Sequence, residues 1–217
     1  MSESERLNTA VDRVDHLVYA TPDVDATSAE LEQRLGVRAS VGGQHFGRGT
    51  RNALIRIGPA CYLEIIGPDA AQPPPPAPRW FGIDTLKAPR LVTWAAAASN
   101  LTRLASVAEQ RGVRLGAVRD GRRERPDGVV LTWQTTDPGV MLADGLVPFF
   151  IDWGASPHPA SSAVTGPRLV GLRGEHPNVA EARGILASLG IALPVDHAST
   201  TALVATFETA SGTVELR

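Results

Sequence analysis

The sequence predicts an α+β protein built from three related modules, two of them βαβββ units and the third a partial βαββ unit. A segment starting at Pro89, PRLVTWAAAASNLTRLASVAEQRGV, aligns without a gap on one starting at Pro167, PRLVGLRGEHPNVAEARGILASLGI, at an offset of 78 residues. At an offset of 77 residues, RVDHLVYATPDVDATSAELEQRLGV near the N-terminus follows the same plan. Each copy has an apolar strand, a polar break, an amphipathic helix and a glycine, which indicates a repeated supersecondary unit.

The repeats divide the chain into six segments. We expect a disordered polar arm at 1–11, the first module at 12–69, a Pro-rich linker at 70–88, the second module at 89–154, a linker at 155–166 and the third module at 167–217. The run QPPPPAPR in the first linker is stiff and extended and cannot form a helix. No module could bury its sheet face alone, so the three are expected to share one structure.

Each element of the first module has a local signal. Residues 14–21 are apolar enough for a buried strand, Pro22 and Asp23 break it, and Asp23 or Asp25 can cap the helix that ends at Gly36. The glycines at 42, 43, 47 and 49 predict an irregular loop. Residues 53–57 and 61–66 are expected to be two strands joined at a turn.

The other two modules repeat this order. In the second, we expect a strand at 90–96, a helix at 100–111 and strands near 113–119, 129–136 and 146–153, with a turn at 126–128. In the third, we expect a strand at 168–173, a helix at 178–189 and strands at 202–209 and 212–216.

Composition narrows the classes of function. The chain has 217 residues, a formal net charge of −2 and no basic stripe, so nucleic acid and acidic membranes are not expected partners. Arg122, Arg123 and Arg125 form the one dense basic run, which we interpret as a solvated hairpin tip. Cys61 is the single cysteine, and neither a secretory signal nor an apolar run of about 18 residues is present. A cytoplasmic location is expected.

Five motifs resemble the glyoxalase-like domain family of the vicinal oxygen chelate superfamily, which includes glyoxalase I, extradiol dioxygenases and bleomycin-resistance proteins. They are VDHLVYATPDV (14–24), GTRNALIRIG (49–58), CYLEIIGPD (61–69), WFGIDTLKAPRLVTWA (80–95) and PFFIDWG (148–154). The resemblance implies that the modules form a half-barrel cup with a small-molecule site inside it, and that copies of the chain can pair as homodimers. It does not imply one reaction, because the fold carries many functions.

The resemblance also implies where the site lies. In the superfamily, the first strand of a unit presents a ligand residue and the last strand a carboxylate, and His16 and Glu64 match these positions. Alignment of the second module places Thr93 opposite His16, where a metal-binding member has its second His, and Asp152 opposite Glu64. We therefore predict Glu64 and Asp152 as catalytic residues and His16, Glu64 and Asp152 as the candidate metal ligands. Strand alternation also predicts that Val14, His16 and Val18 share one face.

Elementary electrostatics supports a role for both carboxylates. Glu64 and Asp152 are flanked by bulky apolar residues, and a buried carboxylate is costly unless it is paired, hydrogen-bonded or bound to metal. A divalent cation would offset their repulsion, or one of them would hold a proton with a raised pKa and act as an acid or base. An ion pair of Glu64 with Arg51 or Arg56 is the structural alternative.

The cofactor and the lining of the cup follow from the same residues. One His with two carboxylates suits Mn²⁺, Mg²⁺ or Fe²⁺ better than Zn²⁺, whereas Thr93 in place of a His favours a cup without metal. Candidate substrate-binding residues have hydrogen-bonding or flat apolar side chains: Thr50, Arg51, Asn52, Trp80, Thr93, Trp133 and His158. For Arg51, a turn with an ion pair to Glu64 is the alternative, and for the tryptophans it is simple packing.

Three functions remain open on the sequence. The first is an enzyme of glyoxalase-like type, a metal-dependent lyase, isomerase or dioxygenase that acts on a small oxygenated compound. The second is a metal-free binding or resistance protein of the same fold, although aromatic content of 5% is low for a pocket of stacked rings. The third is an interaction module, in which Glu64 and Asp152 each pair with an arginine and no pocket exists.

Overall fold

Two β-sheets make up the core of the computed structural model, which describes residues 10–125 and 127–217. The predicted arm at 1–11 lies outside the described residues except at its end, where the short 3-10 helix η1 (Ala10–Arg13) begins. Residue 126, in the predicted turn at 126–128, also lies outside them. None of the helices in the described part of the chain is long and apolar enough to cross a membrane.

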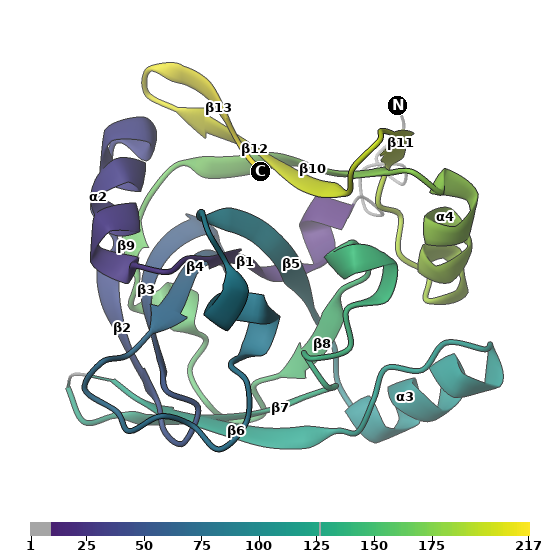
Figure 1. The fold of residues 1–217 in the computed structure, drawn as a ribbon, viewed down its shortest axis with the longest axis horizontal. Helices are drawn as coiled ribbons and strands as arrows, with labels where there is room; N and C mark the ends of the chain where they lie inside the picture. Colours follow the sequence, from purple (N-terminus) through teal and green to yellow (C-terminus); the bar gives the residue numbers. More distant parts are fainter. Residues whose placement is uncertain (1–9, 126) are drawn as a thin grey trace.

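The first module has the predicted βαβββ order (Figure 1). Its elements are β1 (Val14–Ala20), α2 (Val24–Leu35), β2 (Ser40–His45), β3 (Thr50–Gly58) and β4 (Cys61–Pro68). Asp23 caps α2 by accepting hydrogen bonds from the backbone N–H groups of Asp25 and Ala26, and Gly36 ends the helix with φ 75°. The expected loop around Gly42 and Gly43 is wrong, because both glycines lie within β2.

The second module also has one helix and four strands. They are β5 (Arg90–Ala97), α3 (Leu101–Gln110), β6 (Arg119–Glu124), β7 (Val130–Thr135) and β8 (Phe149–Asp152). The expected strand at 113–119 is wrong: Val113 and Leu115 are buried in a segment without strand structure, and the polar run RDGRRE forms β6 instead. The 3-10 helix η3 (Leu142–Gly145) precedes β8.

Both predicted linkers contain ordered pieces. The first contains the 3-10 helix η2 (Trp80–Thr85), and the second contains η4 (Pro159–Ser161) and the short strand β9 (Val164–Thr165). β9 pairs with β3 of the first module, so the second linker returns across the sheet before the third module begins.

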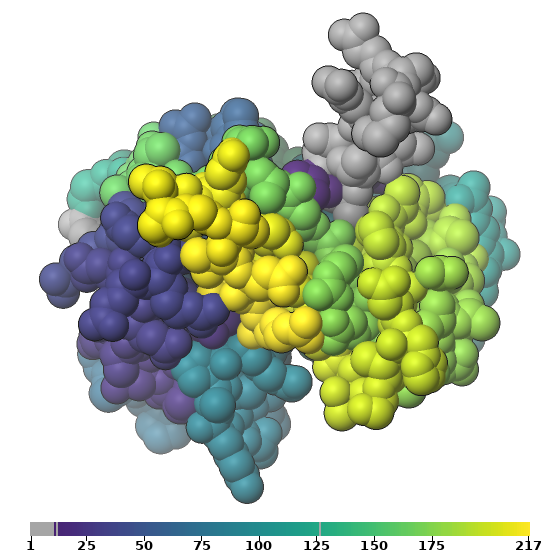
Figure 2. Space-filling model, turned by 90° about the horizontal axis from the view of Figure 1, so that it is seen from above, coloured from purple at the N-terminus to yellow at the C-terminus, as the bar shows by residue number. Residues whose placement is uncertain are grey.

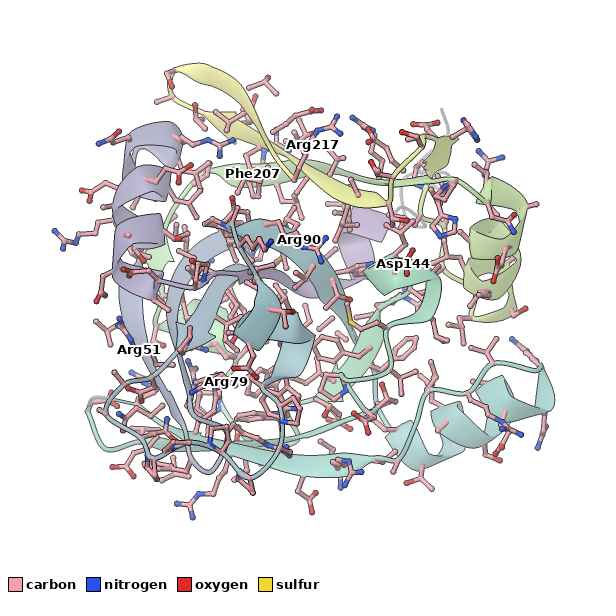
Figure 3. The ribbon with its side chains drawn as sticks, viewed as in Figure 1. Arg51, Arg79, Arg90, Asp144, Phe207 and Arg217 are labelled. Carbon is pink, nitrogen blue, oxygen red and sulfur yellow. The ribbon has the colours of Figure 1, made fainter. Side chains whose placement is uncertain are left out.

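The third module forms a sheet of its own. Its elements are β10 (Arg168–His176), α4 (Val179–Ser188), β11 (Val195–His197), β12 (Ala202–Thr209) and β13 (Gly212–Leu216), with strand order β11-β10-β12-β13. Phe207, labelled in Figure 3, is fully buried between this sheet and the larger one. In Figure 2 the yellow C-terminal hairpin lies against α2, where Arg34 donates a hydrogen bond to the carbonyl of Glu215 (2.7 Å).

The larger sheet curls into a cup. Its order is β2-β6-β7-β8-β5-β1-β4-β3-β9, and β2 also pairs with β3, so eight strands form a continuous ring. The predicted α+β class and the cup are therefore confirmed. Apolar side chains on the outer face pack against the helices and the third module, and a second apolar cluster fills the inside of the cup. This inner face carries the candidate site.

Candidate active site

The inside of the cup holds a cavity of about 50 Å³, measured as the space open to the centre of a water-sized sphere. Six aromatic side chains line it, although the whole chain has four Trp, two Tyr and five Phe residues, so low aromatic content does not argue against an aromatic pocket. These are Tyr62, Trp80, Phe81, Trp133, Phe149 and Trp153. The polar residues in the wall are His16, His45, Asn52, Glu64, Arg123 and Thr135.

His16 is placed by a bulge in β1. Pairing with β5 shifts between Val14 and His16, so Val14 lies in the outer core whereas His16 lines the cavity. The expectation that Val14 shares a face with His16 and Val18 is therefore wrong, because a bulge changes which way the side chains point. The His16 ring stacks on Tyr62 with a centroid distance of 4.7 Å.

The same bulge brings Asp15 to the side of His16. Nδ1 of His16 lies 2.8 Å from Oδ1 of Asp15, and both side chains are buried. Burial alone raises the pKa of Asp15, but hydrogen bonds from His158 and His16 outweigh it and lower that pKa to about 2. The Asp15 carboxylate is therefore an acceptor at neutral pH and His16 donates from Nδ1. In the neutral ring this leaves the lone pair on Nε2 free as a base.

Two residues from the segment after β8 complete the Asp15 network. Nε1 of Trp153 donates to both oxygens of Asp15 (3.2 and 3.1 Å), and Nε2 of His158 lies 3.2 Å from Oδ2. Nδ1 of His158 accepts a hydrogen bond from the backbone N–H of Ala160, which fixes its other nitrogen as the donor. His158, which the sequence predicted to bind substrate, thus donates a hydrogen bond to Asp15 and does not line the cavity.

Glu64 lies beside His16, on the neighbouring strand β4. Its Oε2 is 3.9 Å from Nε2 of His16, and its Oε1 is 3.8 Å from Nε2 of His45 and accepts a hydrogen bond from Asn52 (2.5 Å). The alternative of an ion pair with Arg51 or Arg56 is wrong. Arg51, labelled in Figure 3, pairs with Asp25 of α2 at 2.6 Å, and Arg56 donates to the carbonyl of Gly58.

Arg123 is the arginine that reaches into the cup. Its Nη1 donates to Oδ1 of Asn52 (2.9 Å), and only 3% of its surface is exposed. The interpretation of Arg123 as part of a solvated tip is wrong, because alternation along β6 turns it inward while Arg122 and Glu124 stay exposed. Gly42 makes the room: a Cβ at this position would lie 2.7 Å from Nη1 of Arg123.

His45, from β2, is a second histidine that the sequence did not single out as a strong candidate. Burial lowers its pKa to about 4; the carboxylate of Glu64 opposes this shift and the charge of Arg123 adds to it. Its Nδ1 lies 3.1 Å from the hydroxyl of Thr50, which is buried behind the ring and does not line the cavity. The imidazole of His45 is therefore neutral at physiological pH.

Asp152 does not join this group. Phe149 and Ile151 of β8 face the inside of the cup, so alternation turns Phe150 and Asp152 to the opposite face. Asp152 borders an outer groove with Asp120 and Gln134, and its Oδ1 accepts a hydrogen bond from the N–H of Gly154 (2.9 Å). The predicted convergence of Asp152 with Glu64 came from aligning β8 with β4 one residue out of register.

The structure thus brings together part of the predicted site. His16, Asn52, Glu64, Trp80 and Trp133 line one cavity. The other candidates are not among the described residues that line this cavity. Thr50 contacts His45, His158 contacts Asp15, and Thr93 is buried in β5 beside Val18. Arg51 pairs with Asp25, and Asp152 borders the outer groove.

The three predicted metal ligands, His16, Glu64 and Asp152, are not brought together, because Asp152 lies outside the cavity. Within 10–125 and 127–217, no three His, Cys, Asp or Glu side chains are arranged to hold a metal. From β8 of the second module, the apolar side chains of Phe149 and Ile151 line the cavity. His16 and His45 approach different oxygens of the Glu64 carboxylate, at 3.9 and 3.8 Å. The guanidinium of Arg123 supplies positive charge in their vicinity.

Comparison with known proteins supports the fold. A family model described as a glyoxalase-like domain matches residues 14–190, and no curated protein matches. A hypothetical protein from Staphylococcus aureus has a similar structure, with a TM-score of 0.64, 11% identity and coverage of 91% of this chain and 92% of that one. At this identity the likeness concerns the fold alone.

Two methylmalonyl-CoA epimerases are more remote. The enzyme from Mycobacterium tuberculosis gives a TM-score of 0.44 and 19% identity, over 71% of this chain and 95% of that chain. A Streptomyces coelicolor variant, solved with 2-nitronate-propionyl-CoA, gives 0.45 and 20%, over 66% and 98%. The family model by itself confirms the resemblance to the glyoxalase-like domain family that the motifs predicted.

Proposed function

Because this chain belongs to the glyoxalase-like domain family, we propose that it is a small-molecule enzyme in which His16 and Glu64 move a proton on a flat, oxygenated substrate. The observation that carries the proposal is the hydrogen bond from Nδ1 of His16 to the buried carboxylate of Asp15 (2.8 Å). This bond fixes the tautomer of the ring and directs a basic nitrogen at the cavity.

The arrangement supports proton transfer in two ways. When Nε2 of His16 accepts a proton, the resulting imidazolium lies between Asp15 and Glu64, at 2.8 and 3.9 Å, so both carboxylates stabilise the charge. Glu64, beside His16 on the neighbouring strand and also facing the cavity, can give or take the second proton. An isomerase or lyase that forms and discharges a carbanion next to a carbonyl needs this pair of groups.

The remaining wall orients the substrate and excludes water. Tyr62 and Phe149 border His16, while Trp80 and Trp133 border His45. Rings at these positions favour a planar ligand, since flat apolar faces gain most from contact with flat molecules. Neutral His45 can donate one hydrogen bond to a ligand oxygen. No step of this proposal uses a metal ion.

The test is exchange of carbon-bound hydrogen for deuterium, followed by NMR in D₂O. We would incubate the protein with small carbonyl compounds such as acetylacetone, cyclohexenone and phenylpyruvate, and compare the His16→Gln and Glu64→Gln variants. Exchange should fall about 100-fold or more in each, the usual contribution of a general acid or base. His197→Gln, an exposed histidine of β11, is the matched control and should exchange like the wild type.

A metal-free binding protein is the second candidate, favoured by the six aromatic side chains around the cavity. It predicts ligands that bind at micromolar concentrations and exchange no faster than in buffer. That outcome, or full exchange activity in His16→Gln, would refute the enzyme. The cytoplasmic location and the homodimer stay predictions, checked by cell fractionation and light scattering.

A further inference from the structure

Arg123 is a buried charge with one hydrogen bond from its side chain. Within the described part of the chain only Nη1 has a partner, the amide oxygen of Asn52, although a guanidinium carries five N–H donors. Among the described residues, no carboxylate lies within 4.0 Å of it, whereas Arg51 and Arg79 each have one. A buried charge without a counter-ion is costly, so the fold maintains Arg123 in the wall of the cavity at an energetic expense.

The surrounding chain is adapted to this side chain. Gly42 and Gly43 of β2 lie beside it, and a Cβ on Gly43 would come within 3.0 Å of Cγ of Arg123. Asn52 then bridges Arg123 to Glu64, because its amide accepts from the first and donates to the second. The bridge holds the guanidinium close to Glu64 without neutralising it in a direct ion pair.

A surface pocket that shares Trp80 and Trp133 with the cavity adds a second cation. Arg48 is exposed and stacks over the ring of Trp80, with 4.4 Å between the guanidinium carbon and the ring centroid. Trp80 itself lines the cavity, so an anion that enters past Trp80 meets Arg48 first and Arg123 inside. Two cations along one path favour an anionic ligand.

We propose that the substrate is a flat carboxylic acid whose carboxylate binds Arg123, while the carbon beside its carbonyl or double bond faces His16 and Glu64. This rests on the proposed function for the reacting end only; the anion site stands on Arg123 and its surroundings. A carboxylate matches the planar fork of a guanidinium. It also carries one charge, whereas phosphate carries more and would be repelled more strongly by Glu64.

The experiment measures binding without turnover, so its result is independent of the deuterium exchange. Tryptophan fluorescence serves as the readout, because Trp80, Trp133 and Trp153 line the cavity and Trp94 is buried in the outer core. Each probe is a pair of an acid and its amide: crotonate and crotonamide, benzoate and benzamide, phenylacetate and phenylacetamide. At least one acid should bind about tenfold more tightly than its amide, the value of one charged hydrogen bond.

Three variants test whether the preference for an acid over its amide depends on Arg123. Arg123→Met should abolish it and Arg123→Lys should retain part of it, while Arg122→Met, an exposed neighbour on the same strand, should leave it unchanged. If Arg123→Met does not fold, the acid and amide comparison on the wild type still decides. The proposal is overturned if no acid binds better than its amide, if inorganic phosphate binds more tightly than every acid, or if a folded Arg123→Met variant keeps the preference.

Discussion

Gly42→Ala is the sharpest perturbation of the site, since it adds one methyl group and removes no functional side chain. The added Cβ would lie 2.1 Å from Oδ1 of Asn52 and 2.7 Å from Nη1 of Arg123, both far inside contact distance. The two side chains must therefore separate, and their 2.9 Å hydrogen bond is lost. Both border the cavity and can move into it, which limits the strain.

The expected loss of stability is about 1–3 kcal/mol, the usual cost of one overpacked methyl group, measured by urea denaturation. Binding should change more specifically: the preference for an acid over its amide should fall about tenfold, because the guanidinium is no longer held by Asn52. Gly184→Ala is the matched control. That glycine lies in α4 with open space where the methyl group would be added, so alanine there should stabilise the protein by about 0.5–1 kcal/mol. A Gly42→Ala variant with wild-type stability and unchanged acid preference would refute the placement of Arg123.

Four further outcomes are expected. Asp15→Asn should slow deuterium exchange about 10- to 100-fold with little change in KM, because an amide holds the His16 tautomer poorly. The pKa of Asp15 falls from 3.8 to about 2 on folding, so its stabilising contribution of about 2 kcal/mol is complete above pH 4 and is lost as pH falls towards 2. The free energies of unfolding of the wild type and Asp15→Asn, measured in urea, should therefore converge near pH 2. The pKa of His45 falls from 6.5 to about 4, so stability should decrease from pH 6.5 down to 4 in the wild type and less in His45→Gln, and NMR should find the ring neutral at pH 6. Adding Mn²⁺ or a chelator should leave the melting temperature unchanged, whereas a bound ion would raise it.

The repeated modules could be predicted because their signals are local. Asp23 and Gly36 delimit α2 as their cap chemistry requires, and the buried strands β1 and β4 are mostly apolar apart from their site residues. β6 could not be found this way. Its sequence RDGRRE has no apolar alternation, and its place in the ring depends on pairing with β7 along its whole length.

The site was only partly predictable for the same reason. In β8 the residues Phe149, Phe150 and Ile151 are apolar on both faces, so alternation does not reveal which face is inside, and Asp152 was assigned to the wrong one. Asp15 was missed because its side chain lies beside that of His16 only through a bulge, which depends on the pairing with β5. Strand alternation would place Arg123 on the inner face, between the exposed Arg122 and Glu124, but this can be predicted only once β6 is known to be a strand.

The hydrogen bonds that Trp153 and His158 make to Asp15 also have a consequence for folding during synthesis. Trp153 and His158 follow Asp15 by 138 and 143 residues, so they leave the ribosome long after it. Until then the acid has only His16 beside it, and the closing contacts span most of the chain, which is the slow kind to form. The proton transfer that we propose therefore requires residues as far as 158, and a nascent chain stalled at the end of the second module would lack the hydrogen bond between His158 and Asp15.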